Sequence, residues 1–322
     1  MFIKTSFGSL LKYRQFQAIL IFFAILAVIP LIAFRQPYIM WVIILTMFYA
    51  LLAVSWNLLL GYTKLMSFAH TGLLAMGGYF SVFLVNYVGL PPIISFFVSI
   101  AIVSLIGFLL GWACLRLRGI YLALTTWGLS GVVQLVAMAE YHITGGLKGL
   151  STKFLLPISS FEAPHYYFYI MLALFIICTL TTYMLINSKY GLYLTAIGDS
   201  EEAAATCGVN IVKLRIFVFT ISSMWAGIAG AFYVHLIGYV SPALADFSLM
   251  VTVIASTILG GLGTVMGPII GAFIVWPLSE VIRAYSAGLQ MIILSILILI
   301  FLKFIPNGFV GLLSQIYHRI GR

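Results

Sequence analysis

Three of the seven carboxylates in this sequence fall within four residues, as Asp199, Glu201 and Glu202. The surrounding sequence is strongly apolar, so a cluster of charges at this place has to face water. Small residues follow directly: Ala203, Ala204, Ala205 and, after Thr206 and Cys207, Gly208. A slim apolar face beside carboxylates is suited to a groove with basic residues on another protein. The segment therefore indicates contact with a partner.

Motifs for catalysis and for metal binding are missing from the sequence. No Gly-x-x-x-x-Gly-Lys-Ser/Thr motif and no Gly-Lys pair occurs, so the chain does not bind ATP in the P-loop manner. The five histidines show no ligand pairs at helical spacing, so we expect no metal site. One nucleophile–base arrangement exists, Ser67 with His70. Helix packing or a solute pathway is its preferred interpretation, and an intramembrane enzyme is a remote alternative.

Composition shows what kind of element must carry these residues. The 322 residues are 63% hydrophobic and 7% charged, whereas soluble domains carry about 25% charged residues. Apolar runs of about 17 to 25 residues span a bilayer as helices. We therefore expect an all-α polytopic membrane protein, with spans near 18–34, 38–60, 67–88, 93–115, 119–139, 167–187, 213–236, 247–262, 265–284 and 288–303.

These runs predict ten membrane helices, and eight or nine stay open because the runs after Phe247 are short and contain glycines. Re-entrant segments are tolerated where protein covers them. With both termini in the cytoplasm, twelve of the sixteen Lys and Arg residues lie inside, in agreement with the positive-inside rule. Arg35, Lys148, Lys153 and Arg283 remain outside. The net charge of +9 thus reflects topology and anionic lipid, and we expect no nucleic-acid partner.

The connections are too short for a soluble domain, so residues 1–322 are expected to form one transmembrane domain, with the membrane bundle over 18–304. Two connections are longer than the others. Residues 140–166 lie outside in this topology and end in an aromatic run that suits the membrane interface. Residues 188–212 lie inside and contain the acidic cluster.

Capping rules predict a short helix in the inner connection, near 199–208. Asp199 as N-cap places Glu202 at the third helical position, and Glu201 adds negative charge to the first turn, where the helix dipole favours it. Gly208 suits the left-handed residue that ends a helix. Such a short helix needs packing for stability. Two interpretations stay open, a docking site for another protein and a surface connector that packs on its own bundle.

Few polar residues occur inside the expected spans. Those that could line the path of a small solute, or equally join two helices, are Ser67, His70, Tyr121, Thr125 and Gln134. Glu280 and Arg283 are three residues apart and are expected to pair for structural reasons. No carboxylate is clearly central in a span, which weakens the hypothesis of an ion-coupled carrier. Tight helix packing is indicated by the four-residue spacing of Gly263, Gly267 and Gly271.

Several motifs follow one another in a specific order. Glu202-Ala203-Ala204 with Gly208 is similar to the cytoplasmic coupling motif of ABC importer permeases, although the Leu-Pro ending found in many of them is absent. The other segments are Arg116-Leu117-Arg118-Gly119-Ile120-Tyr121-Leu122-Ala123, Thr144-Gly145-Gly146 with Gly149-Leu150, Gly260-Gly261-Leu262-Gly263-Thr264 with Gly267-Pro268 and Gly271-Ala272, and Pro306-Asn307-Gly308. Together, over about residues 38–313, they resemble the LivM-type permeases of branched-chain amino acid importers.

This resemblance implies a non-catalytic importer subunit in the bacterial cytoplasmic (inner) membrane. Its implied partners are a second, related permease, two cytoplasmic ATPases that use ATP and magnesium, and an extracytoplasmic solute-binding protein. No cofactor is bound by the chain itself. The resemblance places Glu202, Ala203, Ala204 and Gly208 in the helix that docks on an ATPase, with Asp199 and Glu201 beside them.

The chain departs from the family at polar positions. Members often carry Gly-Gln-Leu-Ser-x-Gly-His, whereas this sequence reads Lys64-Leu65-Met66-Ser67-Phe68-Ala69-His70. Many also carry an acidic residue and an Arg where Gly131 and Gln134 stand here. Branched-chain amino acids remain the expected solutes. Urea, a short amide or another small polar metabolite is the alternative.

Overall fold

The computed structural model describes residues 3–32, 36–114, 117, 119–304 and 308–312. Several residues used above lie outside these ranges: Arg35, Arg116, Arg118, Pro306, Asn307, Arg319 and Arg322. In the described part the long elements are α1 (Ile3–Ile32), α2 (Pro37–Asn57), α3 (His70–Asn86), α4 (Pro92–Ala113), α5 (Gly119–Ala139), α7 (Pro164–Asn187), α10 (Ile211–Ile237), α11 (Phe247–Gly260), α12 (Met266–Tyr285) and α13 (Ala287–Phe304).

Each expected span corresponds to one of these long helices, so the all-α interpretation is confirmed. Within the described residues, seven apolar stretches are long enough to cross a membrane: Pro37–Tyr62, Pro92–Ala113, Gly119–Ala139, Pro164–Asn187, Ile211–Ile237, Met266–Arg283 and Gly288–Leu312. The helix α11 has 14 residues and α3 has 17, fewer than the roughly 20 that a full crossing needs. The count of ten crossings and the side of the termini therefore stay predictions.

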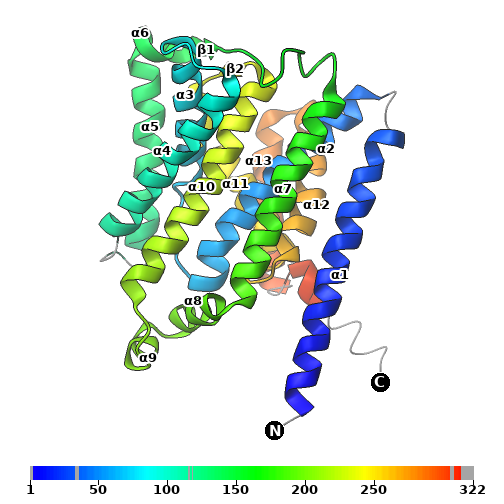
Figure 1. Ribbon diagram of the computed structural model, residues 1–322, viewed down its shortest axis with the longest axis vertical. Coiled ribbons are helices and arrows are strands. Elements are labelled where there is room, and N and C mark those ends of the chain that lie inside the picture. Colours follow the sequence, from blue (N-terminus) through cyan, green and yellow to red (C-terminus); the bar gives the residue numbers. More distant parts are fainter. Residues whose placement is uncertain (1–2, 33–35, 115–116, 118, 305–307, 313–322) are drawn as a thin grey trace.

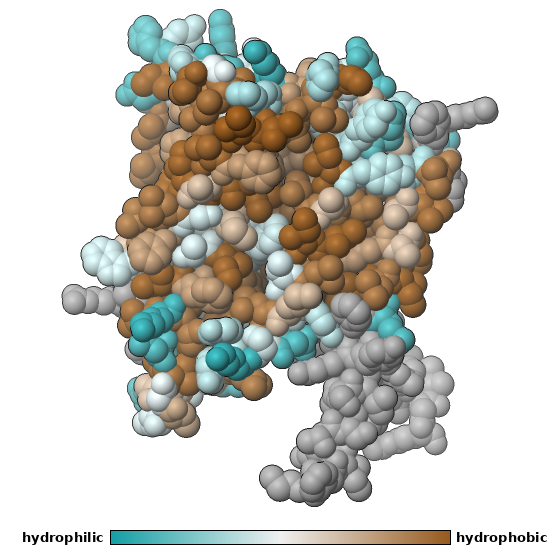
Figure 2. Space-filling model, viewed as in Figure 1, coloured by the Kyte–Doolittle hydropathy of each residue, from teal (hydrophilic) through white to brown (hydrophobic). Residues whose placement is uncertain are grey.

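The helices run along the long axis of the molecule, and the short elements gather at its two ends (Figure 1). Apolar side chains cover most of the middle, and hydrophilic ones concentrate toward both ends (Figure 2). At one end lie α6 (Tyr141–Thr144), η3 (Gly146–Lys148), β1 (Leu150–Ser151), β2 (Tyr239–Val240) and η4 (Pro242–Ala245). At the other lie α8 (Lys189–Asp199), α9 (Glu201–Thr206) and the start of α1. In the expected topology the first end is outside and the second inside.

The outer end is closed by the expected extracytoplasmic connection. Strand β1 pairs antiparallel with β2, with Leu150 opposite Val240 and Ser151 opposite Tyr239. The Thr144 hydroxyl donates to the carbonyl of Ala137 at 2.6 Å. The Thr-Gly-Gly motif therefore shapes a folded cap over the outer end of α5.

The bundle core is formed mainly by α2 and α10. Helix α10 packs against α4 and α3, and α2 packs against α7 and α12. The largest fully buried side chains include Trp56, Phe48, Tyr167, Phe168, Phe175 and Phe232. By contrast, α4, α5 and α13 expose many apolar side chains. Those surfaces require lipid or another membrane subunit beside them.

A break in the helical structure separates α2 from α3. Helix α2 continues into a π-helical turn, η1 (Leu58–Tyr62), and residues 64–68 are not helical. The third expected span therefore begins at His70 and not at Ser67. Backbone groups of this segment, which have no partner within a helix, bond to neighbouring side chains. The Trp56 indole donates to the Ser67 carbonyl at 2.7 Å, and the Phe68 amide donates to the Thr126 hydroxyl at 2.9 Å. Irregular backbone at membrane depth is stable only with such protein partners.

Two of the three regularly spaced glycines lie where α11 and α12 cross closely. A Cβ at Gly271 would lie 1.7 Å from the Ser256 carbonyl oxygen, and one at Gly267 would lie 2.1 Å from that of Gly261. The third differs from the expectation. Gly263 is not helical but lies in the turn between α11 and α12, with φ of +73°. Its amide donates to Oδ1 of Asn57 at 3.0 Å, so it anchors this turn to α2.

Gly271→Ala should destabilise the protein, because the new Cβ meets backbone and forces α11 and α12 apart. Overpacking of this kind costs about 1–3 kcal/mol. The measurement is thermal unfolding in detergent, where a clear decrease of the midpoint is expected. Gly128→Ala on α5 is the matched control, because a Cβ there meets no atom within 4 Å other than its chain neighbours and the nearby backbone of its own helix. Equal midpoints for the two variants would contradict the close crossing.

Candidate functional site

The acidic cluster belongs to a two-helix segment at the inner end of the bundle, the α8–α9 arm (residues 189–208). The Ser188 side chain caps α8 by accepting from the Tyr190 amide. Gly191, Leu194 and Ile197 are buried at a spacing of three residues, so α8 turns one face to the bundle. Leu194 and Ile197 join an apolar cluster with Leu58, Leu59 and other residues at the inner ends of α2 and α10. The sequence interpretation missed α8, because the helix has only 11 residues and one of its three buried positions is a glycine.

The second helix of the arm, α9, is capped at its beginning by Ser200 and not by Asp199. Ser200 has extended backbone angles, φ −159° and ψ 111°, and its side chain accepts from the Ala203 amide at 3.3 Å. Asp199 is the last residue of α8 and so cannot take the extended N-cap conformation. Glu201 and Glu202 occupy the first turn of α9, where the helix dipole stabilises their negative charges.

The end of α9 is fixed by Gly208, as the sequence predicts. Gly208 has φ of +79°. Its amide donates to the Ala205 carbonyl at 3.0 Å, and the Val209 amide donates to the Ala204 carbonyl at 3.1 Å. This pair of bonds is a Schellman motif, which needs a left-handed residue at the glycine position. With both ends closed by hydrogen bonds, the six-residue helix is a defined, rigid turn.

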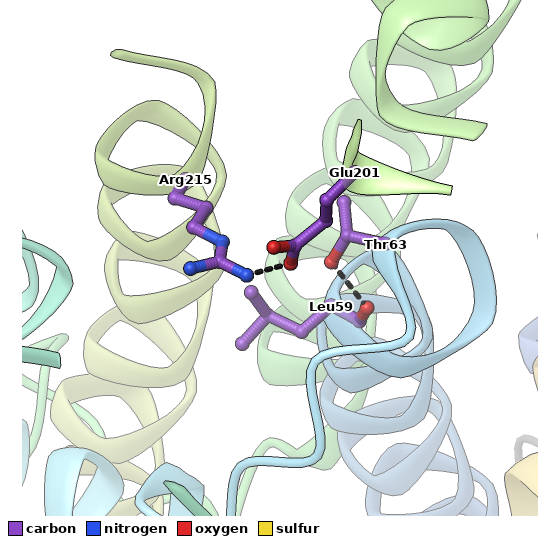
Figure 3. A network of polar contacts seen from close by, with 4 residues as sticks. All are labelled: Leu59, Thr63, Glu201 and Arg215. Atoms are coloured by element: carbon purple, nitrogen blue, oxygen red, sulfur yellow. Dashed lines mark hydrogen bonds and ion pairs between the residues drawn. The ribbon is translucent and has the colours of Figure 1, made fainter. Parts of the chain in front are cut away.

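An ion pair joins α9 to α10. Figure 3 shows the Glu201 carboxylate directed at the Arg215 guanidinium, with Leu59 and Thr63 of the η1 end beside them. The Arg215 side chain is 6% exposed and that of Glu201 is 19% exposed, so water screens this pair little. The sequence interpretation counted Arg215 only as an inner positive charge. Nothing in the linear spacing of residues 201 and 215 signals their contact.

The alanines of α9 divide between the two sides. Ala204 is 4% exposed and packs in the same apolar cluster as Leu59 and Leu214. The other side is open to solvent, and it carries Asp199, Glu202, Ala203, Ala205, Thr206, Cys207 and Gly208. The packing of the arm on its own bundle is thus observed, whereas docking on another protein stays a prediction. One face packs on its own bundle, and the other presents carboxylates and small side chains outward.

His70 and Ser67, expected on a solute path, are buried among helices. The His70 Nε2 lies 2.8 Å from the Ser222 hydroxyl and 3.3 Å from that of Ser55. Ser55 and Ser222 also donate to each other's carbonyl, both at 2.8 Å. This network joins α2, α3 and α10. His70 thus acts as a link between helices, and its hydrogen bonds go to Ser55 and Ser222.

The remaining pathway candidates, Tyr121, Thr125 and Gln134, are on α5, whereas His70 begins α3. Tyr121 and Thr125 are exposed, and Gln134 is half-buried. The opposite face of α5 holds the broken segment through Thr126 and Ser130, whose hydroxyl donates to the Phe68 carbonyl at 3.0 Å. The role of the five residues in a solute path stays a prediction. Among the described residues no group of histidine, cysteine and carboxylate side chains forms a metal site.

Known proteins match this chain over most of its length. Residues 38–302 match the family described as branched-chain amino acid transport system / permease component. The high-affinity branched-chain amino acid transport system permease protein LivM of Escherichia coli is 28% identical over 293 residues, which cover 82% of this chain and 68% of the relative. LivM of Salmonella typhimurium matches with the same figures.

Shorter matches connect the chain to permeases for other solutes. The autoinducer 2 import system permease protein LsrC of Yersinia pseudotuberculosis is 31% identical, over 55% of this chain and 49% of the relative. The fructose import permease protein FrcC of Rhizobium meliloti is 32% identical, over 38% of this chain and 33% of the relative. No solved structure matches this chain. The chain therefore belongs to the family of permease components of branched-chain amino acid transport systems, and it is a multi-pass protein of the inner membrane.

Proposed function

We propose that this chain is the transmembrane permease subunit of an ATP-binding-cassette importer for small amino acids, branched-chain amino acids first among them. The observation that carries the proposal is the α8–α9 arm. It is capped at both ends of α9, tied to α10 by Glu201 and Arg215, and open on the face that carries Glu202 and Ala203. A chain without a P-loop needs such a surface to receive work from a separate ATPase.

In this proposal the arm acts as a lever between an ATPase and the bundle. The ATPase contacts the exposed face of α9, whose residues are Asp199, Glu202, Ala203 and Gly208. Force on α9 passes to α10 through the ion pair and to η1 through the buried Ala204. A π-helical turn such as η1 is a frequent site of functional bending. The chain itself contributes no catalytic residue.

The complete importer would contain a second, related permease, two ATPases that use ATP and magnesium, and an extracytoplasmic binding protein. The exposed apolar surface of α5, with Tyr121 and Thr125, suits the second permease, and a path between the two subunits would then be lined by both. Both termini of this chain would face the cytoplasm, with ten spans in one domain.

The identity of the solute is indicated by the solutes of the relatives and by two residues of this chain that differ from the family pattern. Relatives that match over 82% of this chain are named for branched-chain amino acids, and shorter matches are named for fructose and autoinducer 2. Gly131 and Gln134 stand on α5 where many family members carry charges. Another small polar solute, such as urea or a short amide, is therefore the second candidate for the same class of importer. An ion-coupled carrier is the alternative of a different class.

Glu202→Lys and Gly208→Val should each abolish ATPase association or uptake, while the permease still inserts into the membrane. Lysine reverses the charge of the exposed face, and valine cannot adopt the left-handed angle that closes α9. Co-purification of the ATPases and uptake of labelled leucine measure the effect. Controls of the same chemistry are Glu162→Lys, exposed near the outer end, and Gly89→Val, which has φ of +75° and open surroundings. Unchanged association and uptake in the α9 variants would refute docking on the arm.

Exchange of Glu201 and Arg215 tests whether the ion pair couples α9 to α10. Each single reversal, Glu201→Arg or Arg215→Glu, places like charges together in a poorly hydrated site and should cost about 1–3 kcal/mol in stability. The double exchange should recover part of the unfolding midpoint and of the uptake. Lys213→Glu, an exposed residue of α10, is the control and should leave the midpoint unchanged. Purely additive effects in the double variant would rule out a direct coupling.

Proteoliposomes separate an importer from a carrier. This chain alone should give no uptake of leucine with any ion gradient, whereas the full set of subunits should give uptake that requires ATP. Labelled leucine in the lumen is the readout. Gradient-driven uptake by the chain alone would establish the carrier and overturn the importer proposal.

A further inference from the structure

A cavity of about 560 Å³ lies at the outer end of the bundle, and its wall contains none of the residues expected to line the pathway. It is formed between α2, the end of α10, the segment around η4, and helices α11 and α12. A second cavity of about 260 Å³ shares Tyr49, Ser248, Leu249, Trp276 and Arg283 with it. Small-molecule sites occupy roughly 300–1,000 Å³, so the size suits a small solute.

Opposite charges line the larger cavity, in a chain that has few charges. Asp246 and Arg283 both belong to its wall. Arg283 also pairs with Glu280, with 2.9 Å between Nη2 and Oε2, and its side chain remains 52% exposed. Glu280 is not part of the wall, so the wall itself carries one carboxylate, that of Asp246, and one guanidinium, that of Arg283. A ligand that carries an ammonium group and an anionic group would therefore balance the site better than an anion alone.

The remainder of the wall is aromatic and aliphatic. Tyr49 and Trp276 stack with ring centroids 4.1 Å apart, and the Arg283 guanidinium carbon lies 5.9 Å from the Trp276 ring. Leu244 and Leu249 add aliphatic surface. The Trp276 side chain is almost fully buried, and its indole Nε1 has no hydrogen-bond partner in the described structure. This nitrogen is closed off from solvent, so Trp276 contributes its aromatic surface to the cavity wall.

Each charged residue also has a structural role, but these roles leave room for a ligand. The Asp246 carboxylate accepts from the Ser248 amide at 2.7 Å and so caps α11 through Oδ1. An asparagine caps a helix equally well, so capping does not require the negative charge. The Glu280–Arg283 pair could form on any exposed helix face. It lies instead where Asp246 and two stacked aromatic rings share one cavity.

We propose that this cavity binds a free amino acid with an apolar side chain, with its ammonium group at Asp246 and its carboxylate at Arg283. All wall residues belong to this chain, so the site needs no partner. In the expected topology it opens on the side from which a binding protein delivers solute. The inference rests on the proposed function for that direction, but binding itself requires neither ATP nor the coupling arm.

The test is equilibrium binding of labelled L-leucine to the assembled transporter in nanodiscs, without ATP and without the binding protein. Asp246→Asn removes a charge and keeps the helix cap, and Arg283→Gln removes the guanidinium. Each should weaken binding by about tenfold or more, since each removes a charge-assisted contact. Glu162→Gln, an exposed carboxylate near the outer end that does not line the cavity, should leave binding unchanged. Thermal unfolding of each variant shows whether it is folded.

Ligand analogues test the two charges separately. Leucinamide lacks the carboxylate and isocaproate lacks the ammonium group, so both should compete weakly against leucine. Phosphatidylethanolamine carries a similar pair of charges. Nanodiscs of phosphatidylglycerol, with and without this lipid, distinguish a lipid site from a solute site. Leucine binding that is equal in both supports the proposal, and binding that the lipid abolishes overturns it.

Absence of leucine binding to the folded wild-type transporter would also overturn the proposal, as would unchanged binding in both charge variants. Neither result touches the proposed function, because ATP-driven uptake by the full set of subunits is a separate measurement. Conversely, loss of ATPase docking in the α9 variants should leave leucine binding intact.

Discussion

The whole structure depends on one constraint, that backbone N–H and C=O groups inside a membrane must find partners within the protein. Long helices meet it internally. Between η1 and α3 the chain leaves the helix, and there the Trp56 indole and the Thr126 and Ser130 hydroxyls pair with residues 67–68. The Ser67 carbonyl and both backbone groups of Phe68 thus have protein partners, and the break places an irregular segment next to the inner end of α2.

The same constraint explains why a polar side chain at the inner end of α2 bonds to the backbone of a neighbouring turn. The Asn57 amide binds the turn between α11 and α12 through both its atoms, to the Thr264 carbonyl at 2.9 Å and to the Gly263 amide at 3.0 Å. One turn further along, η1 packs against the α8–α9 arm in a common apolar cluster. Through Asn57 and η1, the inner end of α2 therefore contacts both the turn between α11 and α12 and the α8–α9 arm.

Much of this fold follows from the sequence, because length and apolarity alone define a membrane helix. The ten long helices of the described residues lie at the apolar runs that predict them, and the left-handed Gly208 follows from capping rules. What the sequence did not reveal depends on contacts between distant residues. The pair of Glu201 and Arg215 joins positions fourteen residues apart across a turn, and the burial of His70 depends on Ser222 of another helix. The prediction of Asp199 as N-cap of the short helix was wrong, because Asp199 is the last residue of α8, a helix that was not predicted.

Helices α2 and α10 are the elements that reach both proposed sites. Helix α2 carries Tyr49 in the outer cavity and passes into η1 at the arm, and α10 carries Tyr233 in the cavity and Arg215 at the arm. Between these ends, the reciprocal bonds of Ser55 and Ser222 lock the two helices together. His70 adds α3 to the same unit. Because packed helices with paired polar groups resist gradual deformation, a displacement of α9 would move α2, α3 and α10 as one body. His70, first assigned to a solute path, would then contribute to the stiffness of that body.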